Sequence, residues 1–295
     1  MPLASLLRPY TEPSASPPDG PMAGSPARPS RAEPDRPVRS VLGGVEYFVL
    51  GQGSPVTILG HGLAGSIAET RPLAAQLPGT RVFLHFRGHG GSVAIPQGWD
   101  YDSLAEDLIT VADAEGATGA IGVSMGAGAL MHLASERPDR FSKLAFVMPA
   151  ALTEARTDGA IMKLHRVGEA IATGDQDQLA QLMLEEVPEQ MRGERIAALL
   201  SQRRARDLIG TLPPYAKEGV APLTDIAELA AITAPSLVIA QESDPLHPVP
   251  IARELAQALP NSELLILPVG GVFWTQPETA RAALAAHLAP QDQSD

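Results

Sequence analysis

Short apolar segments alternate with helical segments along most of this chain, and this alternation is the feature that most restricts its fold. The apolar segments are continuous runs: "PVTILG", "RVFLHF", "AIGVS", "KLAFVMP", "SLVIAQ" and "ELLILP". Such runs are typical of parallel strands that are buried on both faces. Helical patterns lie between them, at residues 68–77, 103–114, 125–136, 251–259 and 277–288. Together with a hairpin in "VRSVLGGVEYFVL", whose turn is Gly43-Gly44, the alternation predicts a doubly wound, mostly parallel eight-stranded α/β sheet.

The alternation is interrupted once, and both ends of the chain differ from the rest. Residues 150–229 carry helical patterns such as "DQLAQLMLEEV" without a convincing strand, which predicts a helical lid inserted between two strands. Residues 1–37 are rich in Pro, Ser, Arg and Ala, so we expect a disordered tail there, and we expect residues 291–295 to be disordered too. The predicted core comprises residues 38–149 and 230–290.

Composition argues against several partners and chemistries. The formal net charge of −12 disfavours nucleic acid or an anionic membrane, because their phosphates would be repelled. The chain has 0 cysteines, which excludes disulfides, thiolate nucleophiles and cysteine-ligated metals. No secretory signal is visible in "MPLASLLRPY", since Arg8 and Pro9 interrupt its apolar run, and a cytoplasmic protein is the expectation.

The most specific motif is "GVSMG", which spans Gly122 to Gly126 between the apolar run "AIGVS" and the helical pattern that follows. Gly-x-Ser-x-Gly between a strand and a helix is the nucleophile elbow. Its glycines remove β-carbons that would clash in a tight turn, and the turn raises Ser124 above the carboxyl edge of the sheet. Ser124 is therefore the predicted nucleophile.

A second glycine-rich turn, "GHGLAGS" from Gly60 to Ser66, follows the strand "PVTIL". In acyl transfer, backbone N–H groups stabilise the oxyanion that forms at the attacked carbonyl. The residue after the nucleophile, Met125, and a residue of this turn, Leu63, are the predicted donors. Alone, the turn would be read as a plain glycine turn; beside Ser124, the functional interpretation is favoured.

These motifs and their order resemble the α/β-hydrolase fold superfamily, and the resemblance extends from Val38 to Leu288. The order is the His-Gly turn, "FRGHGGS", "GVSMG", a helical lid and "SLVIAQESDPLHP". The resemblance implies that Asp244, directly after the strand "SLVIAQ", is the acid that orients the base. A loop carboxylate at the same sheet edge as Ser124 can hold an imidazole in the correct tautomer, although a turn aspartate before Pro245 is the alternative.

Two positions depart from the pattern of that superfamily. In "HFRGHGGS", His85 stands where family members commonly have an aspartate. In "LPVGGVFWTQPE", Val272 stands where they carry the general base, and valine cannot accept a proton. With Phe273 and Trp274, Val272 predicts an apolar corner. If the geometry of Asp244 is preserved, Val272→His should restore a base and raise activity on an aryl ester.

Another histidine is therefore needed if the chain is to have a base. His85 and His89 flank the Arg87-Gly88 turn at the carboxyl edge, and either could line the pocket. His247 is the preferred candidate, because it follows Asp244 by three residues at the same edge. The alternative is a loop histidine that packs or caps near the next helix.

The leading hypothesis is a serine hydrolase that acts on a small or medium ester, thioester or lactone with an apolar group, with low activity if the base is poorly placed. The alternative is a non-hydrolytic binding protein, or a cofactor-free lyase or cyclase, on the same scaffold. No cofactor is expected, and no metal, because the spacing of His61, His85 and His89 matches no metal site. The sequence does not indicate an oligomeric state.

Overall fold

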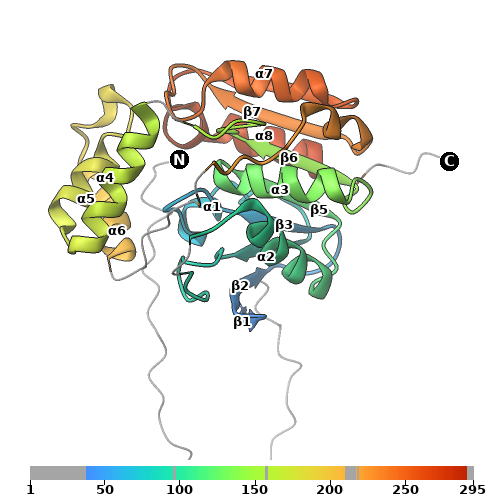
Figure 1. Ribbon diagram of the computed structural model, residues 1–295, viewed down its shortest axis with the longest axis horizontal. Helices are drawn as coiled ribbons and strands as arrows, with labels where there is room; N and C mark the ends of the chain where they lie inside the picture. The colour runs from blue at the N-terminus through green and yellow to red at the C-terminus, as the bar shows by residue number, and fades with distance from the viewer. Residues whose placement is uncertain (1–37, 96–97, 157–158, 210–216, 218, 291–295) are drawn as a thin grey trace, which may run out of the picture.

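One eight-stranded sheet organises the part of the chain that the computed structural model describes, namely residues 38–95, 98–156, 159–209, 217 and 219–290. Its order is β1-β2-β4-β3-β5-β6-β7-β8 (Figure 1). The strands are β1 (Val38–Leu42), β2 (Val45–Leu50), β3 (Val56–Gly60), β4 (Thr80–Leu84), β5 (Gly119–Val123), β6 (Lys143–Val147), β7 (Ser236–Gln241) and β8 (Ser262–Leu267). Only the β1–β2 and β2–β4 pairs are antiparallel, which confirms the predicted mostly parallel sheet. The predictions for residues 1–37 and 291–295 lie outside the described residues.

The strand order reverses at β3, which pairs with β4 on one side and with β5 on the other. The loops that leave β3 and β5 therefore diverge at the same carboxyl edge. In open α/β sheets, ligands bind in the crevice that such a reversal opens. The topology thus brings the turn after β3 and the elbow after β5 to one place.

Helices cover both faces of the sheet. The α-helices are α1 (Ile67–Thr70), α2 (Tyr101–Ala114), α3 (Met125–Glu136), α4 (Gly159–Thr173), α5 (Gln176–Leu184), α6 (Arg195–Leu208), α7 (Val249–Ala258) and α8 (Pro277–Leu288). Short 3₁₀ turns are η2 (Glu189–Met191) and η3 (Ile226–Ala231), and η4 (Gly271–Thr275) is one turn of π-helix. Helices α2, α3 and α7 share one apolar layer with the sheet, whereas α8 packs in the layer on the other face.

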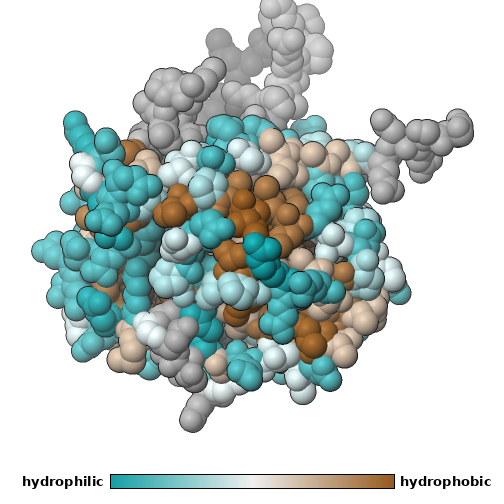
Figure 2. Space-filling view, turned by 90° about the horizontal axis from the view of Figure 1, so that it is seen from above, coloured by the Kyte–Doolittle hydropathy of each residue, from teal (hydrophilic) through white to brown (hydrophobic). Residues whose placement is uncertain are grey.

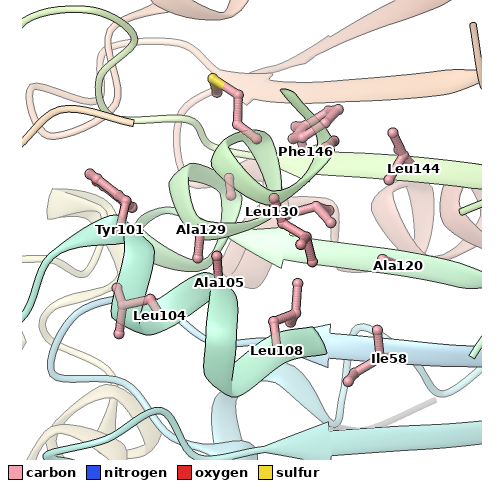
Figure 3. Close-up of a cluster of buried hydrophobic side chains, with 14 of the residues drawn as sticks. Ile58, Tyr101, Leu104, Ala105, Leu108, Ala120, Ala129, Leu130, Leu144 and Phe146 are labelled. Carbon is pink, nitrogen blue, oxygen red and sulfur yellow. The ribbon is translucent and has the colours of Figure 1, made fainter. Parts of the chain in front are cut away.

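The strands serve both layers because their side chains alternate between the two faces. On β5, Ala120 belongs to the α2–α3 layer and Ile121 to the α8 layer; on β6, Leu144 and Ala145 are divided in the same way. All four are essentially inaccessible, which explains the continuous apolar runs in the sequence. Figure 3 shows the first layer, where α2, α3 and the strands contribute Leu104, Leu108, Ala129, Leu130, Ile58, Ala120 and Leu144.

The helix expected over residues 68–77 is wrong in its extent. Only Ile67–Thr70 is α-helical, and the following residues form a series of turns with bonds such as Leu73 N to Thr70 O and Ala74 N to Arg71 O. Pro72 explains the difference, because it has no N–H to continue the helical ladder and its ring crowds the preceding turn. The other expected helices are confirmed to within two residues at each end.

Helices α4, α5 and α6 lie in the chain between β6 and β7 and form a group at one side of the sheet (Figure 1). They have an apolar cluster of their own, which includes Val167 of α4, Leu179 and Met183 of α5, and Ala205 of α6. Ala64, from the turn after β3, is buried in the same cluster. The α4–α6 group therefore packs directly on the edge of the sheet where the two loops diverge.

The surface is mixed in character. Figure 2 shows hydrophobic side chains gathered near the middle of one face, with hydrophilic side chains around them. Among the described residues, none of the helices combines the length and the hydropathy needed to cross a bilayer.

Candidate active site

Ser124 lies in a strained turn between β5 and α3. Its backbone has φ 52° and ψ −112°, a region that costs a side-chain-bearing residue about 1–3 kcal/mol. The turn is tight enough to require both flanking glycines: a β-carbon on Gly122 would lie 2.2 Å from Gly126 O, and one on Gly126 would lie 2.6 Å from Gly60 O. The Gly-x-Ser-x-Gly pattern is therefore a steric requirement of this turn.

The loop after β7 brings an imidazole to this serine. His247 Nε2 lies 2.8 Å from Ser124 Oγ, and His247 Nδ1 lies 2.9 Å from Asp244 Oδ2. Because the Asp244 carboxylate can only accept at Nδ1, the hydrogen bonds assign the proton to Nδ1 and leave Nε2 free to accept from the serine hydroxyl. Both side chains are largely buried, with 11% and 13% of their surface exposed. This is the geometry that a general base needs.

The Asp244 carboxylate is held by its own loop. The backbone N–H groups of Leu246 and His247 donate to Oδ1 over 2.9 and 3.3 Å, and Gln241 Nε2 donates to Oδ2 over 2.8 Å. Burial works against ionisation of Asp244, but the interactions with His247, Gln241 and the Leu246 N–H together outweigh it and lower the pKa of this carboxyl to about 2. The acid is thus charged over the whole neutral range.

Val272 occupies the turn where the resemblance placed a base, and it is completely buried. It belongs to the apolar layer of α8, together with Leu267. Its backbone N–H donates to Gln241 Oε1 over 3.2 Å, and the amide of Gln241 continues to Asp244. The turn therefore supports the acid through a glutamine that the sequence analysis missed; its position three residues before Asp244, at the end of the strand, was the available signal.

The turn after β3 lies against Ser124. A hydrogen bond of 2.9 Å from Gly65 N to Gly62 O closes it, and Ala64 adopts a left-handed φ of 52°. A β-carbon on Gly62 would lie 3.2 Å from Ser124 Cβ and 3.8 Å from Ser124 Oγ, so glycine keeps the space beside the hydroxyl open. No hydrogen bond joins the backbone N–H of Leu63 or of Met125 to another described residue, so both donors are available.

Three histidines at this edge hydrogen-bond to backbone groups of the loops and not to Ser124. His61 Nε2 accepts from Phe86 N over 3.1 Å, and His89 Nε2 accepts from Ala64 N over 3.2 Å. Each Nδ1 contacts a backbone carbonyl, which assigns the neutral tautomer with the proton on Nδ1. Burial lowers the pKa of His89 to about 4 and that of His61 further below its usual value, so both stay neutral.

His85, at the position where the resemblance leads to an aspartate, is the third of these histidines. Its Nε2 accepts from Ile67 N over 3.2 Å, while its Nδ1 lies 2.7 Å from Glu46 Oε2. Glu46 also accepts from Gly91 N over 2.7 Å, and the hydrogen bond with His85 lowers its pKa to about 2. His85 is thereby tied to a buried carboxylate of β2.

The remaining histidines lie away from Ser124. His165 is exposed on α4, and His287 Nε2 donates to Leu144 O over 2.9 Å. His132, on α3, lies with Asp102 and Glu136 so that one ligand atom from each falls within 4.8 Å of the others. Both carboxylates of that group are exposed, and such groups are common on surfaces that bind no metal ion.

The chain matches the model of the α/β hydrolase fold family over residues 55–277. It is 29% identical over 252 residues to a proposed carbamate hydrolase, RutD, of Caulobacter segnis, covering 80% of this chain and 92% of that protein. Among solved structures it is similar to an enol-lactonase from Burkholderia xenovorans LB400 (TM-score 0.67, 19% identity, 84% of this chain and 98% of that one). It is also similar to a thermophilic esterase from Thermogutta terrifontis (TM-score 0.65, 21% identity, 85% and 97%).

Fold and sequence agree on the class of protein: an α/β protein with a strained Gly-x-Ser-x-Gly turn at the switch point of its sheet. The chain belongs to the α/β hydrolase fold family.

Proposed function

We propose that this chain is a serine hydrolase that cleaves a small or medium carboxylic ester, thioester or lactone. The observation that carries the proposal is the continuous hydrogen-bonded chain from Ser124 Oγ through His247 to Asp244. A serine hydroxyl is a weak nucleophile until a base accepts its proton, and here a base is within 2.8 Å. The loop of Asp244, rather than the turn of Val272, then supplies the base.

The reaction follows from the roles of these groups. Ser124 Oγ attacks the carbonyl carbon while His247 Nε2 takes the hydroxyl proton, and the carbonyl oxygen becomes an oxyanion. The N–H groups of Leu63 and Met125 stabilise that oxyanion, aided by the N-terminus of α3. His247 returns the proton to the leaving alcohol or thiol, and a water molecule then attacks the acyl-enzyme with His247 as base.

The residues around Val272 and the similar proteins indicate the substrate class. Val272 is buried, and Phe273 and Trp274 are partly exposed beside it, so an apolar acyl or cyclic group would suit this corner. The similar proteins include one named as an enol-lactonase and one named as an esterase, which agree with an ester or lactone. A carbamate, as named for the Caulobacter segnis protein, has the same reacting carbonyl.

The proposal of a non-hydrolytic binding protein, lyase or cyclase loses its main support. That alternative depended on Val272 and the apparent lack of a base. With His247 at hydrogen-bond distance from Ser124, the substitution no longer argues against hydrolysis.

Labelling with a fluorophosphonate, read by intact mass, tests the proposal. We expect one adduct on the wild type, none on Ser124→Ala, and labelling of His247→Ala that is slower by about 10²–10⁴-fold, the usual contribution of a general base. His165→Ala is the matched control, because that histidine is exposed on α4, and it should label at the wild-type rate. A wild type that does not label under forcing conditions would refute a serine nucleophile. Unchanged labelling of His247→Ala would remove His247 as base.

A further inference from the structure

The turn that carries Leu63 is not stable by itself. Ala64 is held at φ 52°, a left-handed conformation that residues with a β-carbon avoid at a cost of about 1–3 kcal/mol. Leu63 directly precedes Ala64 in the turn that the bond from Gly65 N to Gly62 O closes, so a change of φ at Ala64 would change the shape of the turn that carries the Leu63 N–H. Contacts from outside the turn must therefore hold Ala64 in place.

Those contacts reach Ala64 from the core and from the α4–α6 group. From the core, His89 Nε2 accepts the N–H of Ala64 over 3.2 Å. From the α4–α6 group, Arg204 of α6 donates through Nε to the carbonyl of Ala64, also over 3.2 Å, and the Ala64 side chain is buried in the α4–α6 cluster. Arg204, which lies outside the Ser124–His247–Asp244 chain, thus donates a hydrogen bond to the backbone next to the proposed oxyanion donor.

Arg204 is itself fixed by two carboxylates. Its Nε lies 2.7 Å from Glu69 Oε1 on α1, and its Nη1 lies 2.5 Å from Glu186 Oε2, directly after α5. Burial alone would lower the pKa of Arg204, but the charges of Glu186 and Glu69 outweigh it and raise it. The guanidinium therefore stays charged and ties α5 and α6 to α1.

Packing is incomplete where Arg204 meets the turn, so the hydrogen bond from Arg204 to Ala64 matters more for holding the turn. A cavity of about 220 Å³ borders the turn, and its lining includes Ala64, Gly65, His89 and Arg204. Side chains do not fill the space behind the turn, so the hydrogen bond from Arg204 restrains a backbone that has room to relax.

We propose that Arg204 is a positioning residue, which keeps Ala64 in its left-handed conformation so that docking of α4–α6 completes the oxyanion hole at Leu63. This inference rests on the serine hydrolase function proposed above. It assigns the α4–α6 group a role in catalysis. Without Arg204, Ala64 would relax to a negative φ and shift the adjacent Leu63 N–H away from the oxyanion.

The test is steady-state hydrolysis of a p-nitrophenyl ester by the full chain. Loss of an oxyanion donor lowers kcat by about 10²–10³-fold, and a displaced donor keeps part of its effect. For Arg204→Met we therefore expect kcat to fall by about 10- to 100-fold, with KM changed by less than about threefold and fluorophosphonate labelling slowed in parallel. Arg203→Met is the matched control on the same helix, because Arg203 is half exposed and pairs with Asp207 at 3.9 Å; its kcat should not change.

Two further variants separate positioning from general stability. Arg204→Lys keeps the charge between the two glutamates but lacks the Nε donor, so we expect it to fold and still to lose kcat; it also serves if Arg204→Met does not fold. Ala64→Gly removes the conformational cost, because glycine adopts positive φ freely. The double variant Ala64→Gly/Arg204→Met should therefore recover at least about threefold in kcat over Arg204→Met, whereas a merely structural role would give no recovery.

The outcomes distinguish the two proposals. A wild type that neither labels nor hydrolyses the ester overturns the serine hydrolase function, and the positioning role with it. A wild type that does both, with folded Arg204→Met and Arg204→Lys at the wild-type kcat, overturns the positioning role alone.

Discussion

Acidification should destabilise this protein through His89, and the structure sets the size of the effect. Burial lowers the pKa of His89 from 6.5 to about 4, so below pH 6.5 the unfolded chain binds a proton that the folded chain does not. The contribution of neutral His89 to the free energy of unfolding is therefore fully present above pH 6.5 and is lost as the pH falls towards 4. This difference corresponds to about 3 kcal/mol at low pH, of which about 2 kcal/mol disappears between pH 7.5 and pH 5.

Replacement of the imidazole by a neutral side chain isolates this contribution. In His89→Gln, the amide oxygen can still accept from Ala64 N, but the side chain does not titrate. Urea denaturation, followed by the fluorescence of Trp99 and Trp274, would give the free energy of unfolding at pH 7.5 and pH 5. We expect the decrease between the two values to be about 2 kcal/mol smaller in His89→Gln than in the wild type, because the other titrating groups are common to both.

His165→Gln is the matched control, since His165 is exposed on α4 and should leave the wild-type pH dependence unchanged. An identical decrease in wild type and His89→Gln would refute the reasoning, because it would mean that His89 takes up its proton equally in the folded and unfolded states.

Two further predictions concern the loop of the acid and the turn of the missing base. Asp244→Asn should lower kcat by about 10⁴-fold while the protein stays folded, because an amide at this position favours the wrong tautomer of His247. Measurements of kcat and of thermal stability on the same variant check this, and a loss of kcat below tenfold would contradict it. Val272→His should give no gain in activity on an aryl ester. It should lower the free energy of unfolding by about 1–3 kcal/mol in urea titrations, because a polar ring would replace a fully buried side chain. Increased activity would show that this turn can supply a base.

The sequence was sufficient to predict most of the fold because each signal was local. The continuous apolar runs required strands buried on both faces, and the alternation of their side chains between two layers accounts for them. The tight turn at Ser124 was predictable for the same reason, since its glycines relieve steric contacts within one turn. The α1 region is the exception, because Pro72 ends the helix sooner than its apolar pattern indicates.

The network around the site depends on contacts between segments distant in the chain, which no local pattern encodes. Glu46 and His85 are 39 residues apart, and Arg204 and Ala64 are 140 apart. The change predicted for Val272→His is also revised, because the sequence alone did not show that Gln241 joins this turn to Asp244. Such hydrogen bonds depend on how strands, loops and helices from distant parts of the chain are placed in space.

Asp244 and His247 are three residues apart on a single loop, and this has a consequence for how the site can change over time. Where acid and base come from two different loops, their alignment depends on the relative placement of both. Here one short stretch of chain contains both the proposed acid and the proposed base, so an insertion or deletion beyond β8 does not separate the two groups along the chain. The proposed proton relay therefore stays with the end of β7, and the chain after β8 contributes to it only through the Val272 N–H, which donates to Gln241.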